Sequence, residues 1–161
     1  MSISKSVTEA WQINEGMNKI LIEYLTPEML TAKTPNKDWS IAGYLAHLAV
    51  SKKWWGKHIN EEQASLLPSL FSKTQDGFIA STDLAQIKNV FEQTRKTLLE
   101  IAENVTDKGK LPYPSLEVFL IQQMIHDGHH RGQILLTLRN AGYTPPNDDD
   151  FWGGWWPDQQ L

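Results

Sequence analysis

The sequence predicts an all-α protein, a bundle of four long helices in a single domain spanning residues 1–161. Three observations support this fold class. Four long segments repeat apolar residues at steps of three and four, which gives each one apolar helical face. Ser, Asp, Gly or Pro residues stand where these segments begin or end. No segment shows the alternating pattern of a strand, and 161 residues is the usual size of one domain.

The first predicted helix runs from about Ser4 to Tyr24. A connection follows up to Trp39, in which Thr26 and Pro27 are typical of the first turn of a short helix. The apolar residues expected to face the core from the first helix are Val7, Trp11, Ile13, Met17, Ile20, Leu21 and Tyr24.

Ser40 is the expected N-cap of the second helix, from about Ile41 to His58. Its expected buried stripe includes Ile41, Tyr44, Leu45, Leu48 and Trp55. The segment 60–82 is then expected to form a long crossover without strands that packs on the helices. Because it is long enough to return along the bundle, the second and third helices are expected to run parallel.

The third helix is expected from about Asp83 to Val105. Gly and Pro residues break the chain between Thr106 and Pro114, and Ser115 then caps a fourth helix from about Leu116 to Ala141. The inward residues expected on the third helix are Leu84, Ile87, Phe91, Leu98 and Ile101.

The tail, residues 143–161, holds five aromatic residues. Aromatic side chains bury large areas, so the first expectation is that this tail packs on the bundle or on a partner subunit. The alternative is that it covers a pocket, with Trp152 and Trp155 as part of an apolar wall.

Composition excludes several classes of function. The net charge of −4 argues against broad nucleic-acid binding, which depends on Lys and Arg. No apolar stretch approaches the length of a membrane span, and the N-terminus lacks the pattern of a signal peptide, so a cytoplasmic protein is expected. Because the chain has no cysteine, any metal must be held by nitrogen and oxygen atoms.

The most informative segment lies inside the fourth predicted helix, from His126 to Gln133. His126 and His130 are four residues apart, so both imidazoles lie on one helical face and can bind one divalent metal. His47, beside the buried stripe of the second helix, is the natural third ligand. Three histidines with open coordination positions are typical of a catalytic metal site, in which a bound water or thiol becomes nucleophilic.

Other residues near this segment are candidates for supporting roles. Gln123 and Gln133 share the polar strip of His126 and His130, and Tyr44 and His129 are candidates for the surroundings of the metal. Asp127 fits either support of a ligand or a solvated partner of Arg131. Gly128 costs about 1 kcal/mol in mid-helix relative to Ala, which a close helix contact or room near the metal would explain.

Three other interpretations compete with a metal site. The two histidines of the fourth helix fit hydrogen-bonded core residues as well as ligands. His126-Asp127-Gly128-His129-His130 matches the zincin pattern H-E-x-x-H poorly, since Asp replaces Glu. A carboxylate-bridged di-iron site would need paired Glu-x-x-His motifs, which the histidine helix lacks.

Two blocks of the sequence resemble the DinB/YfiT-like superfamily. Trp39-Ser40 followed by His47-Leu48 is similar to its "W-S-x-x-x-x-x-x-H-L" block, and His126 to Ile134 is similar to its "H-x-x-x-H-R-G-Q-I/L" segment. The resemblance covers nearly the whole chain. It implies a four-helix bundle with a long connection between helices two and three, a homodimer, and a metal held by His47, His126 and His130.

Characterised members of that superfamily include thiol S-transferases and a thiol-dependent isomerase, so the resemblance also implies a low-molecular-weight thiol and a small-molecule substrate. The expected function is therefore a metal-dependent transferase or hydrolase, with zinc or nickel favoured and iron or manganese as further candidates. The alternative is a non-catalytic stress-response module that binds a metal or small molecule. The aromatic segment from Phe151 to Trp156 departs from the family pattern.

Overall fold

The four long helices expected from the sequence are present. The computed structural model describes residues 3–34, 39–105 and 113–152. Its long helices are α1 (Lys5–Tyr24), α2 (Ile41–Lys57), α4 (Leu84–Asn104) and α5 (Leu116–Asn140). The predicted all-α bundle is confirmed, and each helix begins and ends within about two residues of the expected position.

Side-chain caps explain where three of these helices begin. The Oγ atom of Ser40 accepts a hydrogen bond from the backbone N–H of Gly43, and Ser115 caps α5 in the same way. The carboxylate of Asp83 accepts from two backbone N–H groups in the first turn of α4. These bonds satisfy N–H groups that have no partner inside the helix.

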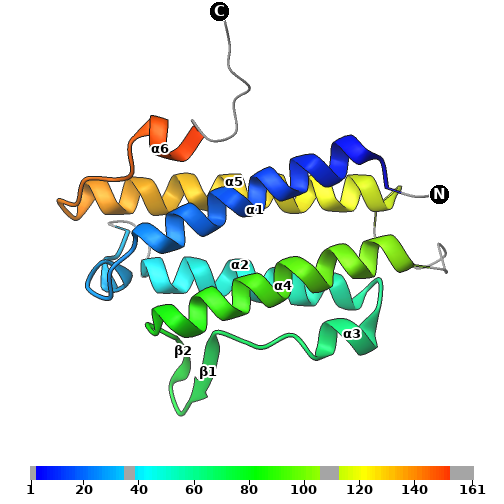
Figure 1. Ribbon diagram of the computed structural model, residues 1–161. Helices are drawn as coiled ribbons and strands as arrows, with labels where there is room; N and C mark the ends of the chain where they lie inside the picture. Colours follow the sequence, from blue (N-terminus) through cyan, green and yellow to red (C-terminus); the bar gives the residue numbers. More distant parts are fainter. Residues whose placement is uncertain (1–2, 35–38, 106–112, 153–161) are drawn as a thin grey trace, which may run out of the picture.

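The long crossover allows α2 and α4 to run in the same direction, as expected, with α1 and α5 running in the opposite direction (Figure 1). Each long helix packs on two others, in the ring order α1, α5, α2, α4. The layer formed by α2 and α5 lies behind α1 and α4 in Figure 1.

The expectation that the crossover lacks strands is wrong. It contains a short helix, α3 (Glu61–Ser65), and an antiparallel hairpin of β1 (Phe71–Thr74) and β2 (Gly77–Ala80). The turn ends at Gly77, whose φ of 134° favours glycine. An Asp-Gly pair between short runs containing aromatic and β-branched residues is a hairpin signal, and here it was missed.

The core also differs from expectation in α1. Ile13 is 36% exposed, whereas Asn14, Glu15 and Asn18 are buried. Polar residues therefore occupy the inward positions of this helix, and they have partners there that are described below.

Short elements complete the chain. The expected turn near Pro27 is the 3₁₀ helix η1 (Met29–Thr31), and the tail forms α6 (Asp148–Trp152), which packs on α1. Phe151 is buried in the main core, and the Tyr24 hydroxyl donates a hydrogen bond to the carbonyl oxygen of Thr144. No helix in the described part of the chain has both the length and the apolar character needed to cross a bilayer.

Candidate metal centre

The structure brings together the three histidines that the sequence singled out. His47 comes from α2, and His126 and His130 come from α5. The Nε2 atom of His126 lies 3.2 Å from Nε2 of His47 and 3.1 Å from Nε2 of His130. One ligand atom from each of the three residues lies within 4.8 Å of the others, so this group could hold a metal ion.

Local structure explains this convergence. His126 and His130 lie one helical turn apart on the flank of α5 that faces α2, and α2 and α5 pack directly on each other. The indole ring of Trp39 lies 5.1 Å from the His47 ring and 5.3 Å from the Tyr44 ring, so it covers one side of the cluster. The Tyr44 ring in turn lies 5.6 Å from the His130 ring.

Gln133 fixes the orientation of one of the three histidines. Its Oε1 atom lies 2.6 Å from Nδ1 of His130. Because an amide oxygen only accepts, Nδ1 of neutral His130 carries the proton, and its Nε2 atom presents a lone pair to the other histidines. A metal-ligating histidine normally donates its second N–H in this way.

The cluster favours uncharged imidazoles. Burial lowers the pKa of His47 and of His126, and the neighbouring His47 lowers the pKa of His126 further. Burial lowers the pKa of His130 to about 4, against the opposing effect of Gln133. All three nitrogen atoms are therefore available as metal ligands near neutral pH.

The donor set fits a first-row divalent metal. Imidazole nitrogens bind zinc at about 2.0–2.1 Å, which places neighbouring ligand nitrogens roughly 2.8–3.4 Å apart across octahedral and tetrahedral geometries. The two Nε2 separations of 3.1 and 3.2 Å lie in that range. Three histidines also leave at least one coordination position open.

A chain of hydroxyl groups holds Tyr44. Thr137 on α5 donates its hydroxyl proton to the backbone carbonyl of Gln133, at 2.8 Å. The Thr34 hydroxyl lies 3.1 Å from that of Thr137, and the Tyr44 hydroxyl lies 3.0 Å from that of Thr34. Each hydroxyl has one proton, so Thr34 donates to Thr137 and Tyr44 donates to Thr34. The chain fixes the Tyr44 ring beside His130.

On its other side, α5 takes part in a buried network of charges. Asp127 and Arg131 directly follow His126 and His130 in the sequence, yet both are buried among α1 and α2. The Nζ atom of Lys52 lies 2.7 Å from Oδ2 of Asp127 and 3.0 Å from Oε1 of Glu15. Two of these four residues are basic and two are acidic.

Two asparagines of α1 link the charged groups. Asn14 and Asn18 each donate a 2.8 Å hydrogen bond to Oδ2 of Asp127. Their amide oxygens each accept a 2.7 Å hydrogen bond from Nη1 of Arg131. Asp127 and Arg131 are therefore connected through the asparagines, and of the two alternatives for Asp127, that of a solvated partner of Arg131 is wrong because Asp127 is buried.

The pKa shifts agree with an ionised Lys52–Asp127 pair. Burial lowers the pKa of Lys52, but the carboxylates of Asp127 and Glu15 outweigh it and raise that pKa overall. Burial raises the pKa of Asp127, but Lys52 and the two asparagines outweigh it and lower that pKa overall. For Glu15, burial dominates and raises the pKa.

This ion network was not predicted from the sequence, although one feature of the sequence indicates it. Lys52 follows Leu48 by four residues and lies on the predicted buried stripe of α2, where a charge requires a partner. Asn14 and Asn18 are also four residues apart, so they share a face of α1.

The remaining candidate residues lie in different environments. Gln123 is buried with no hydrogen-bond partner at Oε1 among the described residues, and His129 is exposed with its ring 4.9 Å from that of His130. Trp152 is the last residue of α6. Trp155 lies outside the described residues, so its predicted place in a pocket wall stays a prediction.

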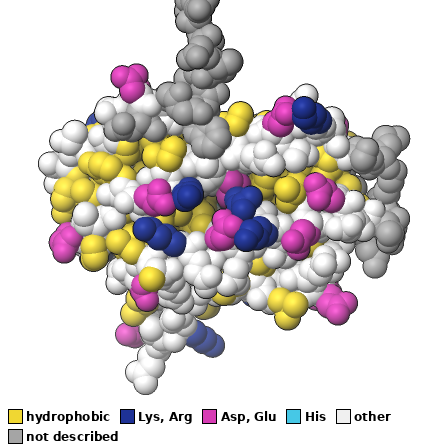
Figure 2. Space-filling view, in the orientation of Figure 1, with side chains coloured by type: hydrophobic (Ala, Val, Ile, Leu, Met, Phe, Trp, Pro, Cys, Tyr) yellow, Lys and Arg dark blue, Asp and Glu magenta, His cyan; other side chains and the backbone are white. Residues whose placement is uncertain are grey.

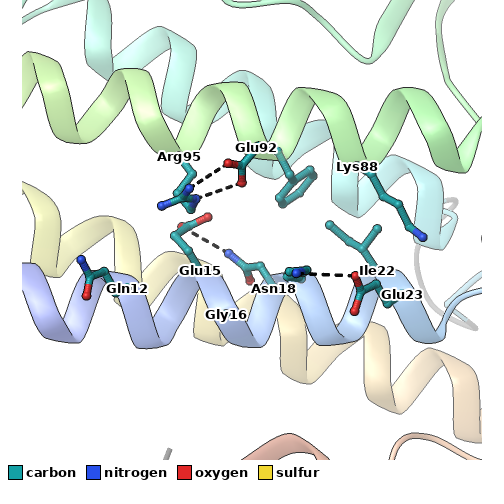
Figure 3. Close-up of a pocket in the computed structure, with 11 residues that line it drawn as sticks. Gln12, Glu15, Gly16, Asn18, Ile22, Glu23, Lys88, Glu92 and Arg95 are labelled. Atoms are coloured by element: carbon teal, nitrogen blue, oxygen red, sulfur yellow. Dashed lines mark hydrogen bonds and ion pairs between the residues drawn. The ribbon is translucent and has the colours of Figure 1, made fainter. Parts of the chain in front are cut away.

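A groove of about 520 Å³ lies on another face of the bundle, between α1 and α4. Figure 2 shows acidic and basic side chains interspersed over apolar ones on this face. In the groove, Glu15 of α1 reaches toward Arg95 of α4, which makes two hydrogen bonds to Glu92 (Figure 3). The histidine cluster instead lies between α2 and α5, so this groove is separate from the candidate metal centre.

Comparison with known proteins agrees with this arrangement. The family model described as DinB family matches residues 1–160. The chain belongs to the DinB family. It is 27% identical over 142 residues to the uncharacterized protein YrdA of Bacillus subtilis (strain 168), an alignment that covers 86% of this chain and 83% of that relative. No solved structure matches the chain significantly. Family membership, predicted from the two histidine blocks, is confirmed.

Proposed function

We propose that this DinB-family protein is a metal-dependent enzyme whose metal is held by His47, His126 and His130. One observation carries the proposal: three neutral imidazoles direct their Nε2 atoms at one point, with separations of 3.1 and 3.2 Å. No cation among the described residues contacts these nitrogens. A divalent metal would accept their lone pairs.

A bound metal would act as a Lewis acid that lowers the pKa of a thiol or water molecule. The protein's own residues orient the site. Gln133 holds the His130 ring through Nδ1, and Tyr44 packs against the same ring. Trp39 covers His47 and is 41% exposed, so it offers an aromatic surface to a bound molecule at the edge of the cluster.

The surroundings favour a thiol over water as the activated group. Asp127 is the carboxylate nearest the ligands in sequence, but it faces Lys52 and the α1 asparagines, so it is not placed to act as a base. A thiol has an ordinary pKa of about 8.5, against about 15.7 for water, and needs less help to lose its proton. The proposed reaction is transfer of a low-molecular-weight thiol to a small electrophile, with hydrolysis as the variant that uses water.

The metal is a divalent transition ion. Imidazole ligands suit zinc, nickel and iron, and the chain has no cysteine to select a softer ion. Zinc or nickel is the first choice for three nitrogens with an open position, followed by iron and manganese.

The test uses protein purified without a histidine tag. We expect about one divalent ion per chain in the wild type and none in a His126→Ala/His130→Ala double variant, with His129→Ala as the matched control that keeps the metal. The metal-loaded protein is then assayed against a panel of thiols with electrophilic acceptors. Equal metal content in the wild type and the double variant would refute the site. Tight metal binding without turnover of any thiol or ester would favour the non-catalytic module.

A further inference from the structure

The groove between α1 and α4 contains a buried carboxylate that the proposed metal chemistry does not use. The side chain of Glu15 is 3% exposed, and it lines the groove from α1. The volume of the groove, about 520 Å³, lies within the range of roughly 300–1,000 Å³ that is usual for small-molecule sites. The groove therefore has room for a small organic molecule in contact with Glu15.

One of the two carboxylate oxygens of Glu15 has no hydrogen-bond donor in the described part of the chain. Oε1 accepts hydrogen bonds from Lys52 at 3.0 Å, from Asn14 at 3.1 Å and from Asn18 at 3.4 Å, whereas Oε2 accepts none. Figure 3 shows the carboxylate directed across the groove toward α4. A buried acceptor without a donor costs free energy, so a ligand that donates a hydrogen bond to Oε2 would be stabilised here.

Glu15 also shares the one ammonium group that contacts it. The Nζ atom of Lys52 lies 3.0 Å from Glu15 but 2.7 Å from Asp127, so a single cation serves two carboxylates. Burial raises the pKa of Glu15 and outweighs the attraction of Lys52. A raised pKa is expected where a buried carboxylate has too little positive charge around it, and a cation at Oε2 would supply that charge.

The guanidinium group opposite Glu15 is held by another residue. Arg95 donates from Nε and from Nη2 to the two carboxylate oxygens of Glu92, at 3.1 and 2.8 Å. No hydrogen bond joins Arg95 to Glu15. Lys88 stands at the opposite end of the groove from Glu15 (Figure 3). The open position beside Glu15 therefore favours a cationic ligand over an anionic one.

Apolar side chains lie next to this position. The Phe91 ring is 5.6 Å from Nζ of Lys52, which itself contacts Glu15, and Phe91 lines the groove one helical turn before Arg95. Ile22 lines the groove from α1. These two side chains offer a surface for the hydrocarbon part of a ligand.

We propose that the α1–α4 groove binds a small protonated amine with an apolar body. The ammonium group donates a hydrogen bond to Oε2 of Glu15, and the hydrocarbon part lies against Phe91 and Ile22. The histidine cluster lies between other helices, so this site needs no metal and the proposal does not depend on the proposed function.

The test is a titration of the full chain with phenethylamine at neutral pH, in the presence of a chelator, followed through the NMR shifts of backbone amides. We expect saturable shifts that are confined to α1 and α4. Phenethyl alcohol, the neutral molecule of similar shape, should bind at least about 10-fold more weakly because it cannot form a charge-assisted hydrogen bond. Hydrocinnamate, which carries the opposite charge, should not bind.

Glu15→Gln removes the charge of the carboxylate and keeps the size of the side chain. It should weaken phenethylamine binding at least about 10-fold, with folding checked by circular dichroism. Glu23→Gln is the matched control, because it makes the same change at an exposed carboxylate at the other end of the groove (Figure 3). It should change the affinity less than about twofold.

Arg95→Gln gives a second test that leaves Glu15 in place. Hydrogen bonds to Glu92 raise the pKa of Arg95, and attraction to Glu15 adds to this effect, so the guanidinium competes with a cationic ligand. Removing it should strengthen phenethylamine binding. The proposal is overturned if the alcohol binds as tightly as the amine, if Glu15→Gln keeps the preference for the amine, or if Arg95→Gln weakens binding.

Discussion

Two neighbouring residues of α5 lie in opposite kinds of environment, and the same is true one turn later. His126 and His130 belong to a cluster of neutral nitrogens, whereas Asp127 and Arg131 belong to a network of buried charges. Consecutive residues are about 100° apart around a helix, so one short segment contributes to both. The sequence His126-Asp127-Gly128-His129-His130-Arg131 therefore contributes residues to two groups of different chemistry.

The two sites differ in whether opposite charges face one another. In the ion network, Asp127 Oδ2 accepts from Lys52 and from two asparagines, and Arg131 donates to the same asparagines. In the histidine cluster, the nitrogens face one another with no counter-charge. Opposite charges that face one another stabilise a buried network, whereas a group of neutral nitrogen lone pairs is suited to binding a cation.

The largest expected effect comes from breaking the ion network. Asp127→Ala leaves the Lys52 ammonium buried with only Glu15 and removes the acceptor of two asparagine amides. We expect the free energy of unfolding to fall by about 3–5 kcal/mol, measured by urea denaturation. Lys96→Met, which removes an exposed ion pair with Glu92, is the matched control and should cost less than about 1 kcal/mol. Equal losses in the two variants would show that the network does not stabilise the fold.

A substitution in the histidine cluster should weaken metal binding and leave the stability of the fold nearly unchanged. His47→Ala removes one ligand from a cluster that has no internal counter-charge, so the metal-free protein should keep its stability within about 1 kcal/mol. Its affinity for zinc or nickel should fall more than about 100-fold, measured by calorimetric titration. A variant that unfolds but still binds metal normally would reverse the roles assigned to the two sites.

A smaller loss is expected at Gln133, which touches a ligand without being one. Gln133→Leu removes the acceptor for the Nδ1 proton of His130, and metal affinity should fall about 10–100-fold. Gln133→Glu restores an acceptor and should recover most of that affinity. If leucine and glutamate behave alike in the titration, the hydrogen bond does not orient the ligand.

The smallest expected effect is a change in how the free energy of unfolding depends on pH. The folded pKa of His130, about 4, lies below the ordinary value of 6.5, so at pH 7.5 the residue is neutral whether the chain is folded or unfolded. As the pH falls from about 6.5 toward 4, the unfolded chain takes up a proton that the folded chain does not, and the free energy of unfolding decreases. In chelator, between pH 7.5 and pH 5, the wild type should lose more stability than His130→Asn. The same loss in both proteins would show that His130 titrates normally.

The positions of the long helices and of the histidine pair on α5 could be predicted from the sequence, because both depend on the spacing of residues along the chain. Helical periodicity placed α1, α2, α4 and α5, and the four-residue step from His126 to His130 placed two candidate ligands. The hairpin was missed because its two strands are short and only the Asp-Gly turn marks it. The ion network was missed because Lys52, Glu15 and Asp127 come from three helices, and their pairing depends on how the helices pack.

The central claim is that a metal ion lies between His47, His126 and His130. The most direct test is anomalous diffraction from crystals grown with zinc or nickel, recorded at the absorption edge of the added metal. The account predicts a single strong peak within bonding distance of all three Nε2 atoms, with at least one coordination position not filled by protein. A crystal of metal-treated protein with no peak at this point, or with its peak at the carboxylates of the α1–α4 groove, would contradict it.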